Sequence, residues 1–267
     1  MQRPDTMGMR RFGTVNWIGF RALYAREVRR FASIFTQTVV APAMTSGLFM
    51  LVFVLAFGER RGDVAGIGFG AFLAPGLLMM SVIQNAFANS SSSIIVAKIQ
   101  GNIIDTLMPP LSPGEMLAGY ALGGATRGIV CAVATGILIF PFAGIGLTHP
   151  IWAVCFVLSG SLMLALVGVL AGIYSDKFDQ MAVITNFLIT PLSFLSGTFY
   201  SIAILPEPFR TLSHFNPFFY LIDGFRYGAA GVSDANPVLG LAVTMALNIV
   251  LAATAWHWLR GGYRLKT

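Results

Sequence analysis

Few side chains in this sequence have the types and spacing that catalysis requires. His149, His214 and His257 are isolated, and no His-Glu-x-x-His pair is present that would bind zinc as in a membrane metalloprotease. No histidine lies well inside an apolar segment, where it could serve as the base for a nucleophilic serine. Cys131 and Cys155 both fall in apolar segments, which indicates small hydrophobic residues with no disulfide or metal framework. The sequence predicts that the chain is not an enzyme and that it holds no metal or cofactor.

The usual ways of driving transport are also missing from the sequence. Lys98, Lys177 and Lys266 are the only lysines, and none follows a glycine, so there is no Gly-x-x-x-x-Gly-Lys phosphate loop to bind ATP. All 11 Asp and Glu residues fall in expected tails, loops or span boundaries. Proton-coupled transporters carry ionisable groups inside their spans. Sodium coupling through carbonyl and hydroxyl oxygens stays open.

Arg127 is the one formal charge expected inside a span. Two interpretations fit it equally well. Its side chain would extend to the inner membrane surface if the span begins in the cytoplasm. Alternatively it would face a transport path, since charged residues inside membranes often mark such paths. Arg127 is therefore a candidate path residue.

The elements that position these residues are membrane helices. The chain is 56% hydrophobic and 10% charged, whereas soluble domains are about 25% charged. No charged residue occurs between Asp63 and Lys98, a stretch far longer than the roughly 20 residues that cross a bilayer. The composition predicts an all-α integral membrane protein, and the net charge of +6 needs no nucleic acid, because membrane insertion and attraction to anionic lipid account for it.

We expect six transmembrane helices. They cover Thr36 to about Phe57, about Val64 to Phe87, two helices between Glu115 and Asp176 with a turn at Gly144 to Pro150, Met181 to about Ile204, and Val238 to Leu259. The second span is expected to end at the polar run Asn89 to Ser93, and Pro191 and Gly197 are expected to bend the fifth. The chain then divides into a cytoplasmic N-terminus (1–35), a six-span transmembrane domain (36–259) and a cytoplasmic tail (260–267).

The basic residues predict the orientation of these spans. With six spans, twelve Lys and Arg residues fall on one side: Arg3, Arg10, Arg11, Arg21, Arg26, Arg29, Arg30, Lys98, Lys177, Arg260, Arg264 and Lys266. Only Arg60, Arg61, Arg210 and Arg226 fall on the other. Because loops rich in Lys and Arg stay in the cytoplasm, both termini are predicted to be cytoplasmic.

The segment before the first span has the pattern of an amphipathic helix. Its apolar side chains recur every three or four residues: Trp17, Phe20, Tyr24, Val28, Phe31 and Phe35. Arginines lie mainly off that stripe. This pattern is typical of a helix at the membrane surface, which we favour about two to one over a cytosolic helix packed on a partner protein.

The connection from Lys98 to Glu115 contains two further signals. Ser112 and Glu115, with Pro113 between them, form a capping box that opens the third span. Upstream, Ile103, Ile104, Leu107 and Met108 are expected on one face of a short helix. That apolar face would bind either a cytoplasmic partner or lipid, and the residues themselves favour neither.

The segment from Leu205 to Pro237 is too polar to span easily and too aromatic to be a free loop. Its prolines break it into short pieces, and Asn216 before Pro217 predicts a turn that divides it. Irregular backbone at membrane depth is tolerated only where it is buried in protein or lines water. We therefore expect a short external helical hairpin that dips into the membrane surface before the last span.

Two blocks in this order resemble the type-2 family of ABC export permeases. The first is GNIIDTLM from Gly101 followed by PLSPGEMLAGY from Pro110 to Tyr120. The second and more specific is FLSGTFYSIAILPEPFRTLSHFNPFFYLIDGFRYG from Phe194 to Gly228, which is similar to the family signature before the last span. Its signature residues here are Pro206, Asn216, Pro217, Gly224, Arg226 and Tyr227.

The resemblance implies a half-size permease of the bacterial inner membrane that pairs with a second copy of itself. Two separate cytoplasmic ATP-binding subunits would bind and hydrolyse ATP, and they would dock on Gly101, Asn102, Ile103, Ile104, Asp105, Leu107 and Met108. The cargo would be an amphipathic or carbohydrate molecule such as a drug, polysaccharide or lipo-oligosaccharide. An ion-coupled secondary transporter is the alternative, and a membrane-embedded lipid-modifying enzyme is a third hypothesis from another class.

Overall fold

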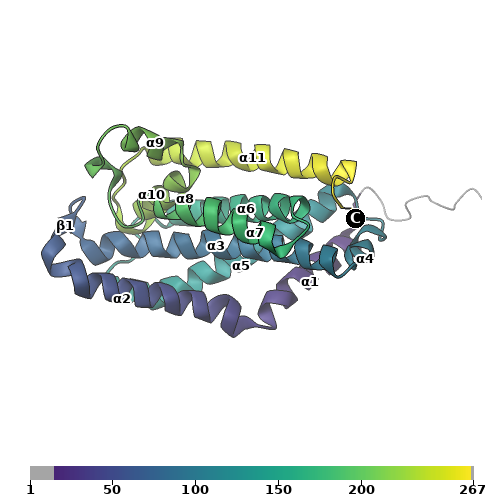
Figure 1. Cartoon of the computed structure of the whole chain (residues 1–267). Coiled ribbons are helices and arrows are strands. Elements are labelled where there is room, and N and C mark those ends of the chain that lie inside the picture. Colours follow the sequence, from purple (N-terminus) through teal and green to yellow (C-terminus); the bar gives the residue numbers. More distant parts are fainter. Residues whose placement is uncertain (1–14, 266–267) are drawn as a thin grey trace, which may run out of the picture.

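The structure, a computed structural model, describes residues 15–265 and shows an all-α membrane protein (Figure 1). Five helices are long and apolar enough to cross a membrane, at Thr36–Gly58, Phe69–Ile99, Pro113–Ala143, Pro150–Tyr174 and Pro237–Gly261. The predicted all-α membrane fold is confirmed. The expected N-terminal residues 1–14 and the end of the tail, with Arg3, Arg10, Arg11 and Lys266, lie outside the described residues.

Two helices form the centre of the bundle and the others surround them. In α3 (Phe69–Ile99) and α6 (Pro150–Tyr174), 78% and 61% of the most apolar window is buried, against 22% in α11 (Pro237–Gly261). Glycines let the two central helices approach closely, because a Cβ added at Gly168 would lie 2.5 Å from the carbonyl oxygen of Phe87. Small residues at helix contacts are the usual device for packing in lipid, where apolar attraction between helices is weak.

The short elements gather at the two ends of the bundle (Figure 1). One end holds the two-residue strands β1 (Asp63–Val64) and β2 (Ile67–Gly68), which pair antiparallel, and the helix α9 (Phe209–Phe215). The opposite end holds α1 (Trp17–Ala32), α4 (Ile103–Leu107) and the C-terminal end of α11. Other helices are α2 (Ala41–Arg61), α5 (Pro113–Ala143), α10 (Pro217–Ala230) and the 3₁₀ turn η4 (Ile202–Ile204).

The segment predicted as the fifth span is a shorter, irregular helix. It runs without interruption through α7 (Phe178–Ile184), the π-helical turn η3 (Thr185–Ile189) and α8 (Thr190–Phe194). The chain then leaves the helix through a turn in which Gly197 has a φ of 75°, well before the expected end at Ile204. This segment is not among the five helices long enough to span among the described residues, so the sixth span stays a prediction.

The predicted end of the second span is wrong. The polar run Asn89 to Ser93, expected to close that helix, lies inside α3, which begins at Phe69 and continues to Ile99. Asn89 and Ser90 are completely buried. The run tolerates burial because side chains from other helices supply its hydrogen-bond partners, which a pattern along one helix cannot reveal.

The N-terminal helix α1 packs on α5 with a face that only partly coincides with the predicted aromatic stripe. Its buried residues are Leu23, Glu27 and Phe31, so Phe31 of the stripe is buried, whereas Trp17 remains 61% exposed. Glycines again permit the contact: a Cβ at Gly123 of α5 would lie 2.5 Å from the Cβ of Glu27. The helix therefore rests on α5 through a partly polar face.

Candidate functional site

A groove of about 660 Å³ runs between α2, α3 and the α7 to α8 segment. Its walls combine apolar side chains with hydroxyl and amide groups. The polar lining residues are Gln37, Thr45, Ser46, Ser81, Gln84, Asn85, Ser91, Ser92, Thr185 and Thr190. Polar side chains inside membrane-spanning helices are costly unless they serve structure or function, and a groove that offers both surfaces suits an amphipathic molecule.

Both π-helical segments of the described chain border this groove. The first, η2 (Thr36–Val40), precedes α2 and contributes Gln37, while η3 contributes Thr185 and Ile189. A π turn widens the helix and frees it to take more than one geometry, and such turns occur frequently at functional sites. The two irregular helices therefore form the walls of the groove, and the regular helix α3 forms its floor.

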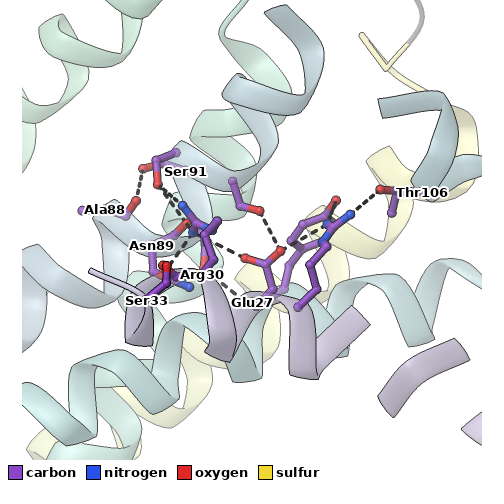
Figure 2. Close-up of polar contacts among 12 residues, drawn as sticks. Glu27, Arg30, Ser33, Ala88, Asn89, Ser91 and Thr106 are labelled. Atoms are coloured by element: carbon purple, nitrogen blue, oxygen red, sulfur yellow. Dashed lines mark hydrogen bonds and ion pairs between the residues drawn. The ribbon is translucent and has the colours of Figure 1, made fainter. Parts of the chain in front are cut away.

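A network of polar side chains joins α1 to the floor helix of this groove, and Figure 2 shows Glu27 and Arg30 at its centre. Glu27 is fully buried and accepts a hydrogen bond of 2.7 Å from the Ser93 hydroxyl. Arg26 and Arg30 lie 3.1 Å and 3.4 Å from the two carboxylate oxygens of Glu27. Arg30 also donates to the hydroxyl of Ser92, at 3.0 Å.

The same network reaches two further helices through Arg26. Its guanidinium donates to the Thr106 hydroxyl of α4 at 2.9 Å and to the Tyr120 hydroxyl of α5 at 3.2 Å. The start of α1 is also fixed to α5, because the backbone N–H of Asn16 donates to Glu115 at 2.8 Å. Glu115 simultaneously completes the predicted capping box with Ser112, which is confirmed. The helix α1 thus connects α3, α4 and α5.

Arg127 is placed beside the groove. Its Nη2 donates to the Asn85 side-chain oxygen at 2.8 Å, and Asn85 lines the groove. The guanidinium is therefore directed toward α3, and both interpretations of Arg127 stay open. Whether it contacts cargo stays a prediction.

The short helix α4 divides its apolar residues between two faces, so the single ridge expected from the sequence is wrong. Ile103 is 8% exposed and packs in the core with the partly buried Leu107, whereas Ile104 and Met108 are 57% and 78% exposed. Residues four apart share a helix face, which explains both pairs. Gly101 precedes the helix with a φ of 74°, a conformation that favours glycine. Asn102 and Asp105 are exposed.

The predicted break at Asn216 and Pro217 is confirmed. Asn216 caps α10 by accepting from the Phe218 N–H at 3.0 Å, and its side-chain amide donates to the Leu192 carbonyl of α8 at 2.8 Å. Pro217 is the first residue of α10, where a missing N–H costs nothing. Asn216 thus joins the hairpin before the last span to the wall of the groove.

The other signature residues hold this hairpin on the bundle. A Cβ at Gly224 would lie 2.1 Å from the Phe156 ring, so only glycine fits there without repacking. Tyr227 stacks on His149 with ring centroids 4.6 Å apart. Pro206 is exposed at the start of α9, where its carbonyl accepts from the Phe209 N–H at 3.0 Å.

Arg226 is fully buried, which corrects its expected place in an external loop. Each guanidinium nitrogen has a partner: Nη1 lies 3.3 Å from Asp223, Nη2 is 2.6 Å from the Gly197 carbonyl, and Nε is 3.4 Å from the Phe72 carbonyl. Asp223 in turn accepts from the backbone N–H groups of Asp234 and Ala235, both at 2.9 Å. Among the described residues, Glu27 and Asp223 are therefore two buried carboxylates that the sequence pattern had placed at boundaries.

Comparison with known proteins agrees with this architecture. Residues 19–229 match the family model described as ABC-2 type transporter. The chain is 34% identical over 251 residues to the inner membrane transport permease YadH of Escherichia coli K12, covering 94% of this chain and 98% of that protein. It is 24% identical over 250 residues to nodulation protein J of Rhizobium leguminosarum bv. viciae, covering 91% of this chain and 94% of that protein. The chain is therefore a membrane-spanning transport permease of the ABC-2 type transporter family.

Proposed function

We propose that this chain is the permease subunit of an ATP-driven exporter in a bacterial inner membrane. The groove between α2, α3 and the α7 to α8 segment carries this proposal, because it offers hydroxyl and amide groups beside an apolar surface within membrane helices. Such a surface fits an amphipathic or carbohydrate cargo. The similarity to the inner membrane transport permease YadH supports a location in the bacterial inner membrane.

The groove is open along one side of the described chain, and a second copy of the permease would close it. The helices that border it carry large apolar side chains on their outer faces, including Leu48 and Leu55 of α2 and Phe187 of η3, which are 58%, 77% and 78% exposed. Lipid or a second copy would cover these side chains. A dimer would enclose a path between two such grooves.

We place both termini and α4 in the cytoplasm. The end of the bundle that holds α1, α4 and the C-terminal end of α11 also carries most of the described Lys and Arg residues, which supports this orientation (Figure 1). The exposed Ile104 and Met108 of α4 then face the cytoplasm and offer an apolar contact for an ATP-binding subunit. Ile103 and Leu107 would anchor the same helix to the permease core.

The energy of ATP hydrolysis would reach the permease through the contact between α4 and the ATP-binding subunit. The sequence has no phosphate loop, so ATP would be bound and hydrolysed by two copies of the partner subunit. Closure of the two ATPases would favour one permease conformation through its different contacts with α4. From α4, the bond between Thr106 and Arg26 provides a direct connection to α1 and the polar network.

The function is tested by reconstituting the permease with a phosphate-loop ATP-binding subunit. Inverted vesicles should take up a fluorescent amphipathic dye or a short lipid-linked oligosaccharide when ATP is added. Uptake should stop when the phosphate-loop lysine of the partner is replaced. Uptake that survives this replacement but collapses with a protonophore would establish the secondary-transporter alternative.

The docking contact is tested separately with Ile104→Asp. The substitution puts a charge into an apolar contact, so co-purification of the ATPase should fall at least tenfold, corresponding to about 1.4 kcal/mol or more. Leu212→Asp is the matched control, because Leu212 is 66% exposed on α9 at the opposite end of the bundle. Equal co-purification of the two variants would remove α4 as the docking site.

A further inference from the structure

Two arginines from different helices converge on one face of α3. Arg127 of α5 donates to the side chain of Asn85 at 2.8 Å, and Arg30 of α1 donates to the side chain of Asn89 at 3.1 Å. Asn85 and Asn89 are four residues apart, so their side chains lie one above the other on adjacent turns. The two guanidinium groups therefore bind to neighbouring turns of the same face of α3.

Three N–H donors near Asn85 and Asn89 have no oxygen acceptor among the described residues. They are Nε of Arg30, Nε of Arg127 and the side-chain amide of Asn89, and each of these atoms is buried. The Cys131 side chain lies beside the Arg127 guanidinium, but a thiol is only a weak acceptor. A buried donor without a good acceptor is unfavourable, and more so if it is charged, so the chemistry that this corner requires is that of acceptor oxygens.

The excess of positive charge in this corner favours the binding of an anion. The Glu27 carboxylate is shared between Arg26 and Arg30. Arg127 forms no ion pair within the described chain. This leaves an excess of positive charge in a place where surrounding helices exclude much of the water.

The corner is also reached from outside. Asn85 and Ser92, the partners of Arg127 and Arg30, are part of the groove wall, and the Arg30 side chain keeps 35% of its surface exposed. The helix α1 lies at the same end of the bundle as α4, where membrane headgroups would meet the protein in the proposed orientation (Figure 1). A ligand in the groove with an apolar tail would bring its headgroup to the arginines.

We propose that Arg30, Arg127 and Asn89 form a binding site for the phosphate group of an anionic amphiphile. Guanidinium groups match phosphate oxygens in geometry as well as in charge, and the planar fork of arginine makes two parallel hydrogen bonds to them. The phosphate belongs either to an anionic phospholipid of the membrane or to an amphipathic cargo with its own phosphate. The site does not require ATP or a partner subunit.

Binding is measured on the purified full-length chain in nanodiscs of phosphatidylcholine, with phosphatidylglycerol titrated in and native mass spectrometry or a fluorescent lipid as the readout. Saturable binding is expected for the unaltered chain. Arg30→Gln and Arg127→Gln should each weaken it roughly tenfold or more, because each loses charge-assisted hydrogen bonds. Arg29→Gln is the matched control, since Arg29 is exposed on the same helix.

Several results would overturn the proposal. If Arg29→Gln weakens binding as much as Arg30→Gln, the lipid binds through the overall positive charge of the surface and not through this site. If the affinity is unchanged in both Arg30→Gln and Arg127→Gln, the corner is not the site. A long-chain phosphorylated glycolipid that displaces phosphatidylglycerol would identify a cargo-type source, whereas inorganic phosphate that binds alone and with equal affinity would exclude the amphiphile.

Folding defects are separated from binding defects by a fourth variant. Arg127→Lys keeps the charge but loses the Nε donor and the planar fork, so its affinity should fall between those of the unaltered chain and Arg127→Gln. The thermal unfolding midpoint of each variant is measured without phosphatidylglycerol. A graded loss of affinity at an unchanged midpoint supports the site, and a loss of affinity that follows the midpoint across all variants contradicts it.

Discussion

Arginines at opposite ends of this permease are satisfied to different degrees. In the hairpin before the last span, all three nitrogens of the buried Arg226 have partners and Asp223 balances its charge. At the α1 end, Glu27 pairs with Arg26 and Arg30 but not with Arg127, and Arg30 and Arg127 keep Nε donors without a hydrogen-bond acceptor among the described residues. Arg226 is therefore fully paired within the described chain, whereas the arginines at the α1 end could bind a further acceptor.

This difference separates a structural role from a functional one. An ion pair in which every nitrogen already has a partner gains little from a ligand, and its value lies in fixing α10 against α3 and the turn at Gly197. A cluster with excess charge and free donors is less stable on its own but can bind an anion. A buried arginine in a membrane protein therefore points to ligand binding only where the protein leaves its charge or its N–H donors without partners.

The largest loss of stability is expected when the ion pair between Arg226 and Asp223 is broken. Arg226→Met leaves the Asp223 carboxylate buried without its counter-charge and removes the bonds to Gly197 and Phe72, at a cost of about 3–5 kcal/mol. Thermal unfolding in detergent should show a large drop in midpoint or loss of monodisperse protein. Arg210→Met is the control, because Arg210 is exposed at the same end. Equal midpoints for the two variants would refute the structural role of the pair.

A smaller loss of stability, together with a change in lipid affinity, is expected when Glu27 is replaced beside Arg26 and Arg30. Glu27→Gln removes the only carboxylate facing Arg26 and Arg30, but their side chains are 46% and 35% exposed and keep contact with water. The loss of stability should therefore be about 1–3 kcal/mol. The same change raises the positive charge of the corner, so affinity for phosphatidylglycerol should increase.

Asp105→Asn is the control for Glu27→Gln, since Asp105 is an exposed acidic residue on neighbouring α4. It removes one negative charge without touching the network. Lower lipid affinity in Glu27→Gln would contradict the charge argument and would mean that the carboxylate is needed to hold the arginines in place.

The smallest loss of stability is expected when one methyl group is added at Gly123, where α1 rests on α5, and the same addition at Gly224 serves as the comparison. Gly224→Ala would place a Cβ 2.1 Å from the Phe156 ring in the packed centre, which should cost about 1–3 kcal/mol. Gly123→Ala meets Glu27 of α1, which lies at the edge of the bundle and can move away at lower cost. Gly123→Ala should therefore leave the unfolding midpoint higher than Gly224→Ala does, while α1 becomes easier to cleave with protease.

Gly146→Ala is the control for both glycine variants, since a Cβ there meets no atom within 4 Å. It should leave the midpoint and the protease pattern unchanged. If Gly123→Ala destabilises the protein more than Gly224→Ala, the α1 contact is as rigid as the hairpin contact, and the comparison between the two ends fails.

The sequence by itself determined the features that depend on neighbouring residues. Long apolar stretches identified the membrane helices, because each must satisfy its own backbone polar groups within the bilayer. The capping box at Ser112 and Glu115 and the break at Asn216 and Pro217 were likewise predictable, since both are local hydrogen-bonding patterns. The two family blocks marked the short helix α4 and the hairpin in order along the chain.

Only the tertiary structure decided which polar residues are buried and what satisfies them. The run from Asn89 to Ser93 looks like the end of a span, yet it continues α3 because Arg30 and Glu27, about sixty residues earlier, supply its partners. Ile103 and Ile104 are adjacent and chemically equal, but the core next to α4 buries the first and leaves the second exposed. Burial and charge compensation depend on contacts between segments that are far apart in the sequence, so the periodicity of a single helix cannot predict them.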